Sequence, residues 1–288
     1  MSFLTYQNRA RFKPCLIFLL KFDTSLLILW YDEIMKIVTY NINGARASMK
    51  HGIVDWIKFV HADIICIQEI RASKEVCEEI FKDCGYQMIV NPAHKKGYSG
   101  TMVLTKIKPL SIEFGFGFLD EEGRVITLDF GSFKLVNAYI PNGSSRLDVK
   151  LKFVEKFIDY ISLLEKEKPV IICADMNTAQ TELDLTNPKS CVNHSGFLQE
   201  ERVLQKKIID CNFVDILREK HHNKLLITWR SYRSRILGDD FGWKFRFDYI
   251  YCSDRLFSIV QSADILNLEY SDHLPILVDF GDIYANKQ

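Results

Sequence analysis

The stretch VIICADMN at residues 170–177 joins a short apolar run to a carboxylate and an amide. Apolar runs of this length before a turn are typical of strands buried on both faces. Residues 36–43 (KIVTYNIN) and 63–69 (DIICIQE) follow the same pattern, an apolar run that ends in amide or acidic side chains. Each stretch therefore predicts a buried strand whose polar end lies at an edge of a sheet.

Similar short apolar runs alternate with amphipathic segments from residue 35 to residue 280. Periodicity predicts helices at residues 50–60, 75–84, 147–164, 200–210 and 214–221. Strands are expected at residues 36–40, 63–68, 86–90, 101–105, 125–130, 133–140, 170–174, 247–252, 263–268 and 276–280. This pattern predicts the α+β class, as a four-layer α/β sandwich in which helices flank two packed mixed β-sheets. The polar stretch 177–196 between two core elements has the length of a functional loop.

Residues 1–34 differ from the rest of the chain and are interpreted as an N-terminal extension to one domain at residues 35–288. Two apolar patches at 15–20 and 26–31 are too short and too interrupted by charge for a membrane span. No small-residue cleavage site follows them. Because Met35 directly precedes the first strand, the favoured hypothesis is that Met35 is the biological start. A disordered segment, a weak membrane or targeting segment, and an ordered extra element are the alternatives.

The charge and cysteine content exclude nucleic-acid binding by overall positive charge and a zinc site of Cys-x-x-Cys spacing. The 37 basic and 37 acidic residues give zero net charge, so any nucleic-acid binding must come from a local patch. The eight cysteines form no Cys-x-x-Cys pair, which excludes the usual zinc spacing. Scattered thiols of this kind are expected to be reduced in a cytoplasmic protein.

Acids, amides and a histidine stand beside five predicted strands: Asn41 and Asn43, Glu69, Asp175 and Asn177, Asp248, and Asp272 with His273. Taken singly, each is commonly a turn former or a cap. Together they provide oxygen ligands for a hard cation such as Mg²⁺ or Mn²⁺. A histidine beside an aspartate can face developing negative charge, and an aspartate can deprotonate a water. The set predicts a phosphodiester hydrolase.

Seven sequence blocks strengthen this hypothesis: MKIVTYNINGARA (35–47), IICIQEIRA (64–72), KKGYSGT (95–101), NAYIPNG (137–143), ICADMNTAQTELDLTNPK (172–189), SGFLQEER (195–202) and SDHLPI (271–276). In this order they resemble the exonuclease III family of abasic-site endonucleases, within the endonuclease/exonuclease/phosphatase superfamily. The resemblance covers residues 35–280 and implies that residues 35–288 form a nuclease domain.

The resemblance implies a metal site and a water-activating group. Glu69 would be the principal metal ligand, with Asn43 and Asp272 close to the metal. Asp175 would activate the attacking water or carry a proton. Because Asn43 is Asp in some relatives, the site here has one negative charge less.

The resemblance also implies a phosphate-binding set. Asn41 and Asn177 would hold the phosphate and the carboxylates in place. His273, oriented by Asp248, would face a non-bridging phosphate oxygen. Tyr139 would bind or polarise the scissile phosphate.

DNA binding is expected from aromatic and basic side chains near the C-terminal third. Trp229 and Trp243 resemble residues that line the pocket for a flipped-out abasic sugar, although the segment from Trp243 to Asp248 is longer than usual. Basic residues interleaved with aromatic ones fit contact with the DNA backbone. The residues concerned are Arg230, Arg233, Arg235, Lys244 and Arg246, with Lys95 and Lys96 as a second patch. A solvated basic face is the alternative.

The expected protein is a monomeric DNA repair nuclease without a stable protein partner, dependent on Mg²⁺ with Mn²⁺ as substitute. Its substrate would be double-stranded DNA with abasic sites or 3′ blocking groups. It would cut 5′ to the abasic site and also act as a 3′→5′ exodeoxyribonuclease that trims 3′ ends. The main alternative is a phosphatase or phosphodiesterase of the same fold acting on a non-DNA substrate. An inactive DNA-binding module is a second alternative, against which the complete polar set argues.

Overall fold

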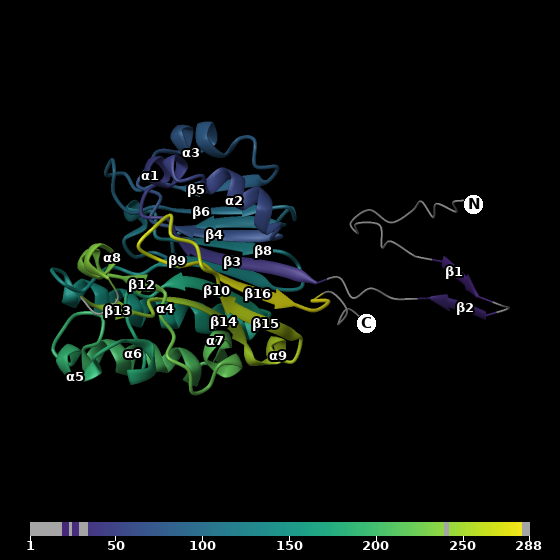
Figure 1. Ribbon diagram of the computed structural model, residues 1–288. Helices are drawn as coiled ribbons and strands as arrows, with labels where there is room; N and C mark the ends of the chain where they lie inside the picture. Colours follow the sequence, from purple (N-terminus) through teal and green to yellow (C-terminus); the bar gives the residue numbers. More distant parts are fainter. Residues whose placement is uncertain (1–18, 23–24, 29–33, 239–241, 284–288) are drawn as a thin grey trace.

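The computed structural model describes residues 19–22, 25–28, 34–238 and 242–283 (Figure 1). The remainder of the predicted N-terminal extension lies outside the described residues. Two six-stranded sheets pack face to face, the first in the order β15-β16-β3-β4-β6-β5 and the second in the order β11-β14-β10-β9-β8-β7. The first sheet consists of β3 (Met35–Asn41), β4 (Ile64–Gln68), β5 (Gln87–Asn91), β6 (Thr101–Thr105), β15 (Val260–Ile265) and β16 (Ile276–Phe280). The second consists of β7 (Ser111–Phe114), β8 (Val125–Asp129), β9 (Lys134–Tyr139), β10 (Val170–Asp175), β11 (Phe213–Asp215) and β14 (Asp248–Ser253).

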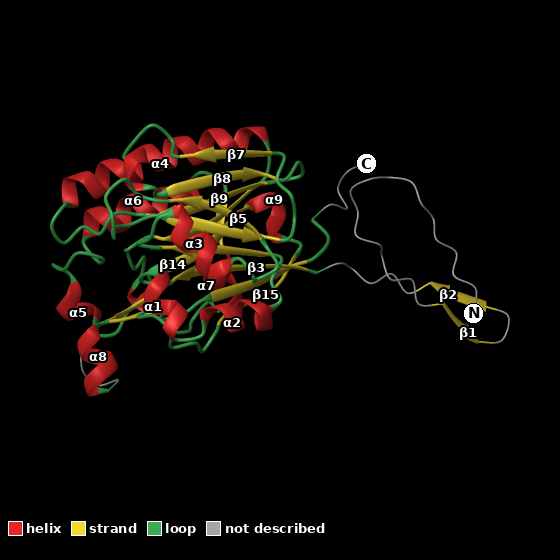
Figure 2. Cartoon of the chain, turned by 90° about the horizontal axis from the view of Figure 1, so that it is seen from above, coloured by secondary structure: helices red, strands yellow, loops and turns green. Residues whose placement is uncertain are grey.

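Helices cover the outer face of each sheet. The first sheet carries α1 (Ala45–Lys50), α2 (Ile53–Val60) and α3 (Lys74–Phe81), and the second carries α4 (Leu147–Glu167) and α6 (Gln199–Asp210). Figure 2 places α4 and α6 on the opposite side of the strands from α1 and α2. These are the four layers that the sequence predicts.

The central core lies between the two sheets, because apolar strand residues of both sheets meet there. Ile37 and Ile64 from the first sheet pack against the cluster that contains Leu135, Ile171 and Ile250 from the second. Both sheets are mixed, since β3 pairs with β4 and β9 with β10 in parallel, whereas the other pairs within them are antiparallel. The predicted fold class is therefore confirmed.

Several predicted boundaries are wrong for identifiable reasons. The helix expected at 50–60 begins only at Ile53, as α2, because its N-cap Gly52 adopts a left-handed conformation with φ 88°, and Lys50 is instead the last residue of α1. The segment expected to be helical from residue 214 forms β11 first, and α7 (Ile216–Lys220) begins after the N-cap Asp215. The periodicity did not predict β7, because all four of its residues are exposed at a sheet edge.

The remaining elements are short. They are β1 (Leu19–Phe22), β2 (Ser25–Ile28), η1 (Asp120–Glu122), η2 (Glu182–Asp184), α5 (Pro188–Cys191), β12 (Trp229–Arg230), α8 (Tyr232–Leu237), β13 (Lys244–Phe245) and α9 (Asp254–Phe257). The predicted loop at 177–196 thus contains η2 and α5. Within the described ranges, no helix is both long and apolar enough to cross a membrane.

Candidate active site

The polar ends of the strands meet at one rim of the sandwich. Asp175, the last residue of β10, pairs with Tyr139 at the end of β9 and with Asp248 at the start of the antiparallel β14. Asn41 at the end of β3 reaches across to the second sheet, since its Nδ2 donates to Asp175 Oδ2 at 2.8 Å. The same Nδ2 donates to Glu69 Oε2 at 3.1 Å. One buried amide therefore holds carboxylates from both sheets together.

Three residues of this rim adopt left-handed backbone conformations that cost energy for side chains other than glycine. The φ angles are 48° at Asn43, 56° at Glu69 and 48° at Asn177. Hydrogen bonds hold two of these turns, because Asn43 N donates to Asn41 Oδ1 and Asn177 N donates to Asp175 Oδ1, both at 2.9 Å. Backbone strain held by its surroundings is a feature of functional sites.

His273 lies between two carboxylates. Its Nδ1 is 2.8 Å from Asp248 Oδ2, and its Nε2 is 3.9 Å from Asp175 Oδ2. Burial opposes a charge on this imidazole, but Asp248 and Asp175 outweigh burial and raise the pKa of His273 to about 10. At neutral pH the side chain is a cation that can donate a hydrogen bond to an anionic oxygen.

Asp175 has the environment of a general base. Burial, together with the charge of Asp248, raises the pKa of Asp175 to about 7, against the opposing effect of His273. A carboxyl with a pKa near the working pH is suited to accept a proton from water.

Tyr139 remains a neutral phenol at this rim. Burial raises the pKa of Tyr139 well above its ordinary value, and the carboxylates of Glu69 and Asp175 raise it further. Arg124, which the sequence did not indicate, lies over the Tyr139 ring at 4.9 Å and donates to its carbonyl oxygen at 2.9 Å. A hydroxyl held in this way can donate to a phosphate oxygen.

The side chains expected to bind metal supply the hard oxygen atoms that Mg²⁺ or Mn²⁺ prefers. Asn43 Nδ2 donates to Asp272 Oδ1 at 2.8 Å, which leaves Asn43 Oδ1 buried and without a hydrogen-bond partner. The surrounding bonds and the charge of His273 overcome the effect of burial and lower the pKa of Asp272, so it is ionised at neutral pH. An orphaned acceptor beside a carboxylate fits a cation. In a second possible group, Asp175, Asp248 and His273, the ligand atoms lie within 4.8 Å of one another, but His273 Nδ1 already pairs with Asp248 Oδ2 at 2.8 Å.

With this geometry established, comparison with known proteins decides the family. Residues 38–273 match the model of the endonuclease/exonuclease/phosphatase family. The chain belongs to this family. An exodeoxyribonuclease of Bacillus subtilis is 37% identical over 250 residues, which cover 84% of this chain and 98% of that protein. A DNA-(apurinic or apyrimidinic site) endonuclease of Dictyostelium discoideum is 36% identical over 254 residues, 84% of this chain and 69% of that protein.

The fold of an AP endonuclease from Archaeoglobus fulgidus is also similar to this member of the endonuclease/exonuclease/phosphatase family. The two structures have a TM-score of 0.76 and 28% sequence identity, over 85% of this chain and 99% of the other. The comparisons confirm the predicted relationship to exonuclease III-type AP endonucleases and the predicted class of enzyme, a DNA repair nuclease.

A buried lysine supports the rim of this nuclease, although its sequence position in an amphipathic helix did not indicate it. Lys150 of α4 is 1% exposed, and its Nζ donates to Asn177 O and Glu201 Oε1, each at 2.7 Å. Asn177 in turn donates through Nδ2 to Ile140 O at 2.9 Å. Lys150 therefore fixes the strained turn that carries Asn177.

The nuclease places its two predicted pocket tryptophans differently. Trp229 Nε1 donates to Asp272 Oδ2 at 3.0 Å, and the Trp229 ring packs 5.2 Å from the ring of Phe247. Trp243 is exposed, and its ring lies 4.5 Å from the ring of His194 in the 177–196 loop. Trp229 thus contacts a predicted metal ligand, whereas Trp243 contacts the loop.

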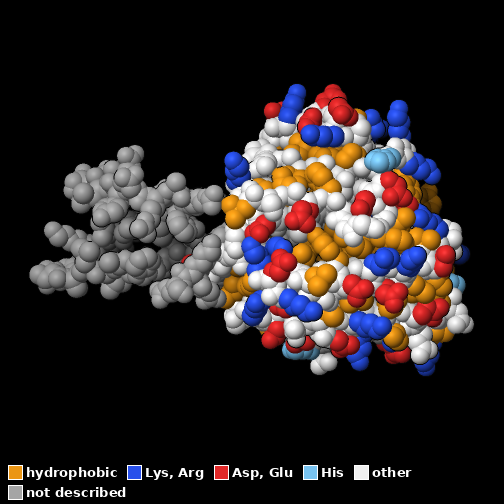
Figure 3. All heavy atoms as spheres, turned by 180° about the vertical axis from the view of Figure 1, so that it is seen from behind, with side chains coloured by type: hydrophobic (Ala, Val, Ile, Leu, Met, Phe, Trp, Pro, Cys, Tyr) orange, Lys and Arg blue, Asp and Glu red, His pale blue; other side chains and the backbone are white. Residues whose placement is uncertain are grey.

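The predicted basic surface is only partly present. Arg233 and Arg235 of α8 are exposed, as are Lys95 and Lys96, whereas Arg230 is partly buried and pairs with Glu269 at 3.3 Å. Figure 3 shows a face on which basic and acidic side chains are interspersed, in keeping with zero net charge. Arg233, Arg235, Lys95 and Lys96 therefore remain the exposed candidates for contact with DNA.

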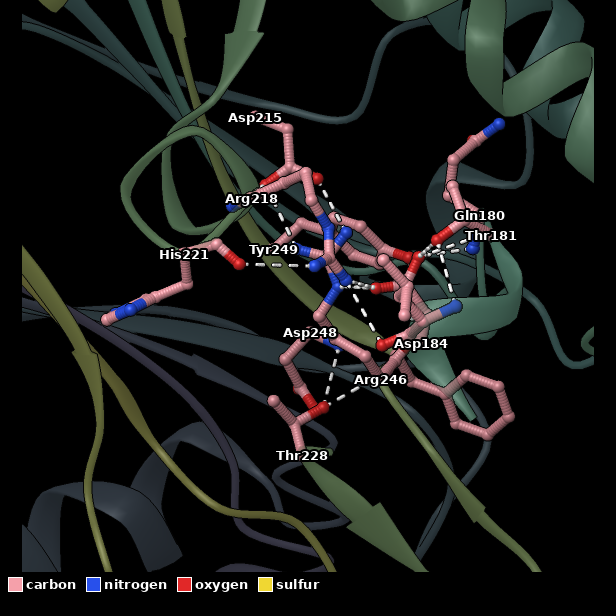
Figure 4. A network of polar contacts seen from close by, with 12 residues as sticks. Gln180, Thr181, Asp184, Asp215, Arg218, His221, Thr228, Arg246, Asp248 and Tyr249 are labelled. Carbon is pink, nitrogen blue, oxygen red and sulfur yellow. Dashed lines mark hydrogen bonds and ion pairs between the residues drawn. The ribbon is translucent and has the colours of Figure 1, made fainter. Parts of the chain in front are cut away.

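The expectation that Arg246 belongs to this surface is wrong. Its side chain is fully buried and pairs with Asp184 at 2.8 Å and Asp215 at 2.6 Å (Figure 4). A buried guanidinium is stable only with such partners. Arg246 therefore connects η2 to β11 beside Asp248, and it cannot neutralise DNA phosphates.

Proposed function

We propose that this chain cleaves the phosphodiester 5′ to an abasic site in duplex DNA, leaving a 3′-hydroxyl and a 5′ deoxyribose phosphate. The proposal also includes removal of nucleotides and blocking groups from 3′ ends by the same site. The active unit would be residues 35–288, acting as a monomer. The names of its relatives support the substrate class.

The observation that carries the proposal is the buried arrangement of Asp248, His273 and Asp175. It places a cation 3.9 Å from a carboxylate whose pKa is about 7, beside the amide of Asn41. An acceptor for the proton of water and a donor for a phosphate oxygen are thus adjacent. Hydrolysis of a phosphate ester needs both functions.

In the proposed reaction, Asp175 accepts a proton from the water that attacks the phosphorus atom in line with the leaving 3′ oxygen. The bond between phosphorus and that oxygen breaks, and the oxygen takes up a proton from solvent to become the 3′-hydroxyl. His273, Tyr139 and Asn177 donate hydrogen bonds to the phosphate oxygens, whose negative charge increases as the water attacks. Asn41 orients the carboxylates of Asp175 and Glu69 through its Nδ2.

Glu69, Asn43 and Asp272 would hold a divalent cation, Mg²⁺ or Mn²⁺. When bound, the cation would neutralise charge on the phosphoryl oxygens. Trp229, which hydrogen-bonds Asp272, would form one wall of the pocket for the abasic sugar. Arg233, Arg235, Lys95 and Lys96 would contact the DNA backbone.

The test uses a duplex with one tetrahydrofuran abasic analogue, incubated with the full chain in Mg²⁺ or in EDTA. We expect one cut 5′ to the analogue in Mg²⁺ and none in EDTA. The same duplex without the analogue, an inositol polyphosphate and a phospholipid serve as competing substrates. Faster hydrolysis of either non-DNA substrate would contradict the proposal.

A further inference from the structure

Arg71 forms an ion pair with Glu69, the carboxylate that the proposed function assigns to the metal. Arg71 Nε and Nη2 donate to Glu69 Oε1 at 3.0 and 2.5 Å. Asn41 Nδ2 donates to the other oxygen, Oε2, at 3.1 Å. Both oxygens of the carboxylate therefore have a hydrogen-bond donor before any cation binds.

The backbone directs this ion pair. Glu69 and Arg71 both adopt left-handed conformations, with φ angles of 56° and 48°. Hydrogen bonds from Gly44 N to Glu69 O at 2.8 Å and from Arg71 N to Ser99 O at 2.9 Å hold the turn. The aliphatic part of Arg71 also packs near Gly44, where an added Cβ would lie 3.7 Å from Arg71 Cδ. The orientation of Arg71 toward Glu69 is therefore a consequence of the fold.

Arg71 reduces the net negative charge that attracts a cation to the proposed metal site. Glu69 and Asp272 bring two negative charges to the proposed metal site, Asn43 is neutral, and Arg71 adds one positive charge. A divalent cation at Glu69 must lie beside the guanidinium or displace it from Oε1. Displacement is feasible, because the Arg71 side chain is 46% exposed whereas that of Glu69 is only 13% exposed. Half-exposed ion pairs are weak enough to exchange.

We propose that Arg71 is a positioning residue that holds Glu69 in the metal-free enzyme and competes with the divalent cation for this carboxylate. The inference rests on the proposed assignment of Glu69 as a metal ligand. Arg71 thereby lowers the metal affinity of the site and holds Oε1 of Glu69 in one orientation when no metal is bound. A phosphate-binding role for Arg71 alone would not predict either effect.

The experiment measures Mn²⁺ binding to the full chain without DNA, from the electron paramagnetic resonance signal of free Mn²⁺, and Mg²⁺ binding by calorimetry. We expect Arg71→Met to tighten binding by about two- to tenfold, since it removes a competing charge. In EDTA, the melting temperature of Arg71→Met should be lower than that of the wild type. Addition of metal should raise the melting temperature of the variant by more than it raises that of the wild type. Arg71→Lys, which keeps the charge, should bind metal with nearly wild-type affinity.

Arg46→Met is the matched control, because Arg46 is an exposed cation on the neighbouring helix α1. This variant should bind Mn²⁺ as the wild type does. Unchanged or weaker binding by a folded Arg71→Met protein would overturn the inference. Glu69→Ala separates this failure from that of the proposed function: if Glu69→Ala binds metal normally, the metal assignment and the Arg71 inference both fail. Weak binding by Glu69→Ala with unchanged binding by Arg71→Met would overturn the Arg71 inference alone.

Discussion

His273 Nδ1 lies 2.8 Å from Asp248 Oδ2, and both side chains are buried. Asp248 is itself held at the start of β14, where its backbone N donates to Thr228 Oγ1 at 3.1 Å (Figure 4). The carboxylate orients the imidazole and stabilises its charged form, so that Nε2 is presented toward the rim. This relationship connects the charge of His273 to a residue that would not touch the substrate.

The first prediction concerns pH. Because the pKa of Asp175 is raised to about 7, its carboxylate form grows as the pH rises through that value, and kcat/KM should rise with it. The pKa of His273 is raised to about 10, so its cation and kcat/KM should be lost above that pH. A bound divalent cation favours the ionised Asp175 and should move the acidic limb to lower pH. A pH profile at two Mg²⁺ concentrations measures both limbs.

Asp248→Asn should change both limbs of that profile. Loss of the carboxylate lowers the pKa of His273, so the alkaline limb should move to lower pH. Because the charge of Asp248 also raises the pKa of Asp175, the acidic limb should move to lower pH as well. At neutral pH we expect a loss of roughly 10²-fold or more in kcat, as for removal of a donor to a transition-state oxyanion. An alkaline limb that stays in place would show that another group is responsible for it.

Asp175→Asn should separate catalysis from stability. The variant keeps the shape of the side chain but removes the base, so kcat should fall by roughly 10²–10⁴-fold with KM little changed.

The same variant should also change the stability of the protein. The raised pKa of Asp175 means that this carboxyl ionises from about pH 3.8 upward in the unfolded chain, whereas in the folded protein it keeps its proton until about pH 7. Stability contributed by protonated Asp175 is therefore lost across that range. Calorimetry at pH 8 should show a higher melting temperature for Asp175→Asn than for the wild type, and a lower one would contradict this account.

Lys150→Met should destabilise the protein and slow the reaction. Removal of the ammonium leaves the Glu201 carboxylate buried without its ion-pair partner, which typically costs about 3–5 kcal/mol. Lys150→Met with Glu201→Gln should regain part of the free energy of unfolding, because neither member of this pair then buries a charge. Since Asn177 O still lacks its donor, kcat should stay low in the double variant. Recovery of activity together with stability would mean that Lys150 serves only the fold.

The salt dependence of DNA binding tests the assignment of the basic residues on α8. Each phosphate contact contributes about −0.9 to the slope of log affinity against log salt. Replacement of Arg233 and Arg235 by Ala should therefore flatten the slope by about two. Lys206→Ala with Lys207→Ala removes the same charge from exposed positions of α6, on the outer helix layer, and is the matched control. Equal slopes for the two double variants would place the DNA elsewhere, with Lys95 and Lys96 the next pair to replace.

Local sequence patterns were sufficient for the framework of the fold and for several of the candidate residues. Apolar runs predict β3, β4 and β10, and the polar residues at or just after their ends are Asn41, Glu69 and Asp175. The prediction succeeds because the position of the residue after a strand is fixed by the end of that strand, independently of the segment that follows. The two parallel pairs, β3 with β4 and β9 with β10, then bring these ends to the same side of the sandwich.

Contacts between distant parts of the chain decided the rest. Lys150 and Arg246 have the sequence context of exposed cations, yet each is buried beside an acidic partner. These partners are distant in the sequence, since Glu201 lies 51 positions from Lys150 and Asp215 lies 31 positions from Arg246. Burial of a charge depends on whether folding supplies a partner, and no local pattern contains that information. Arg71 is only two positions from Glu69, but the left-handed turn that directs it to the carboxylate is held by Ser99 and Gly44. The sequence by itself thus determined which polar side chains stand at the ends of the strands, since that follows from strand periodicity. Only the tertiary structure decided which charges are paired, buried or exposed there, since that follows from the packing of distant segments.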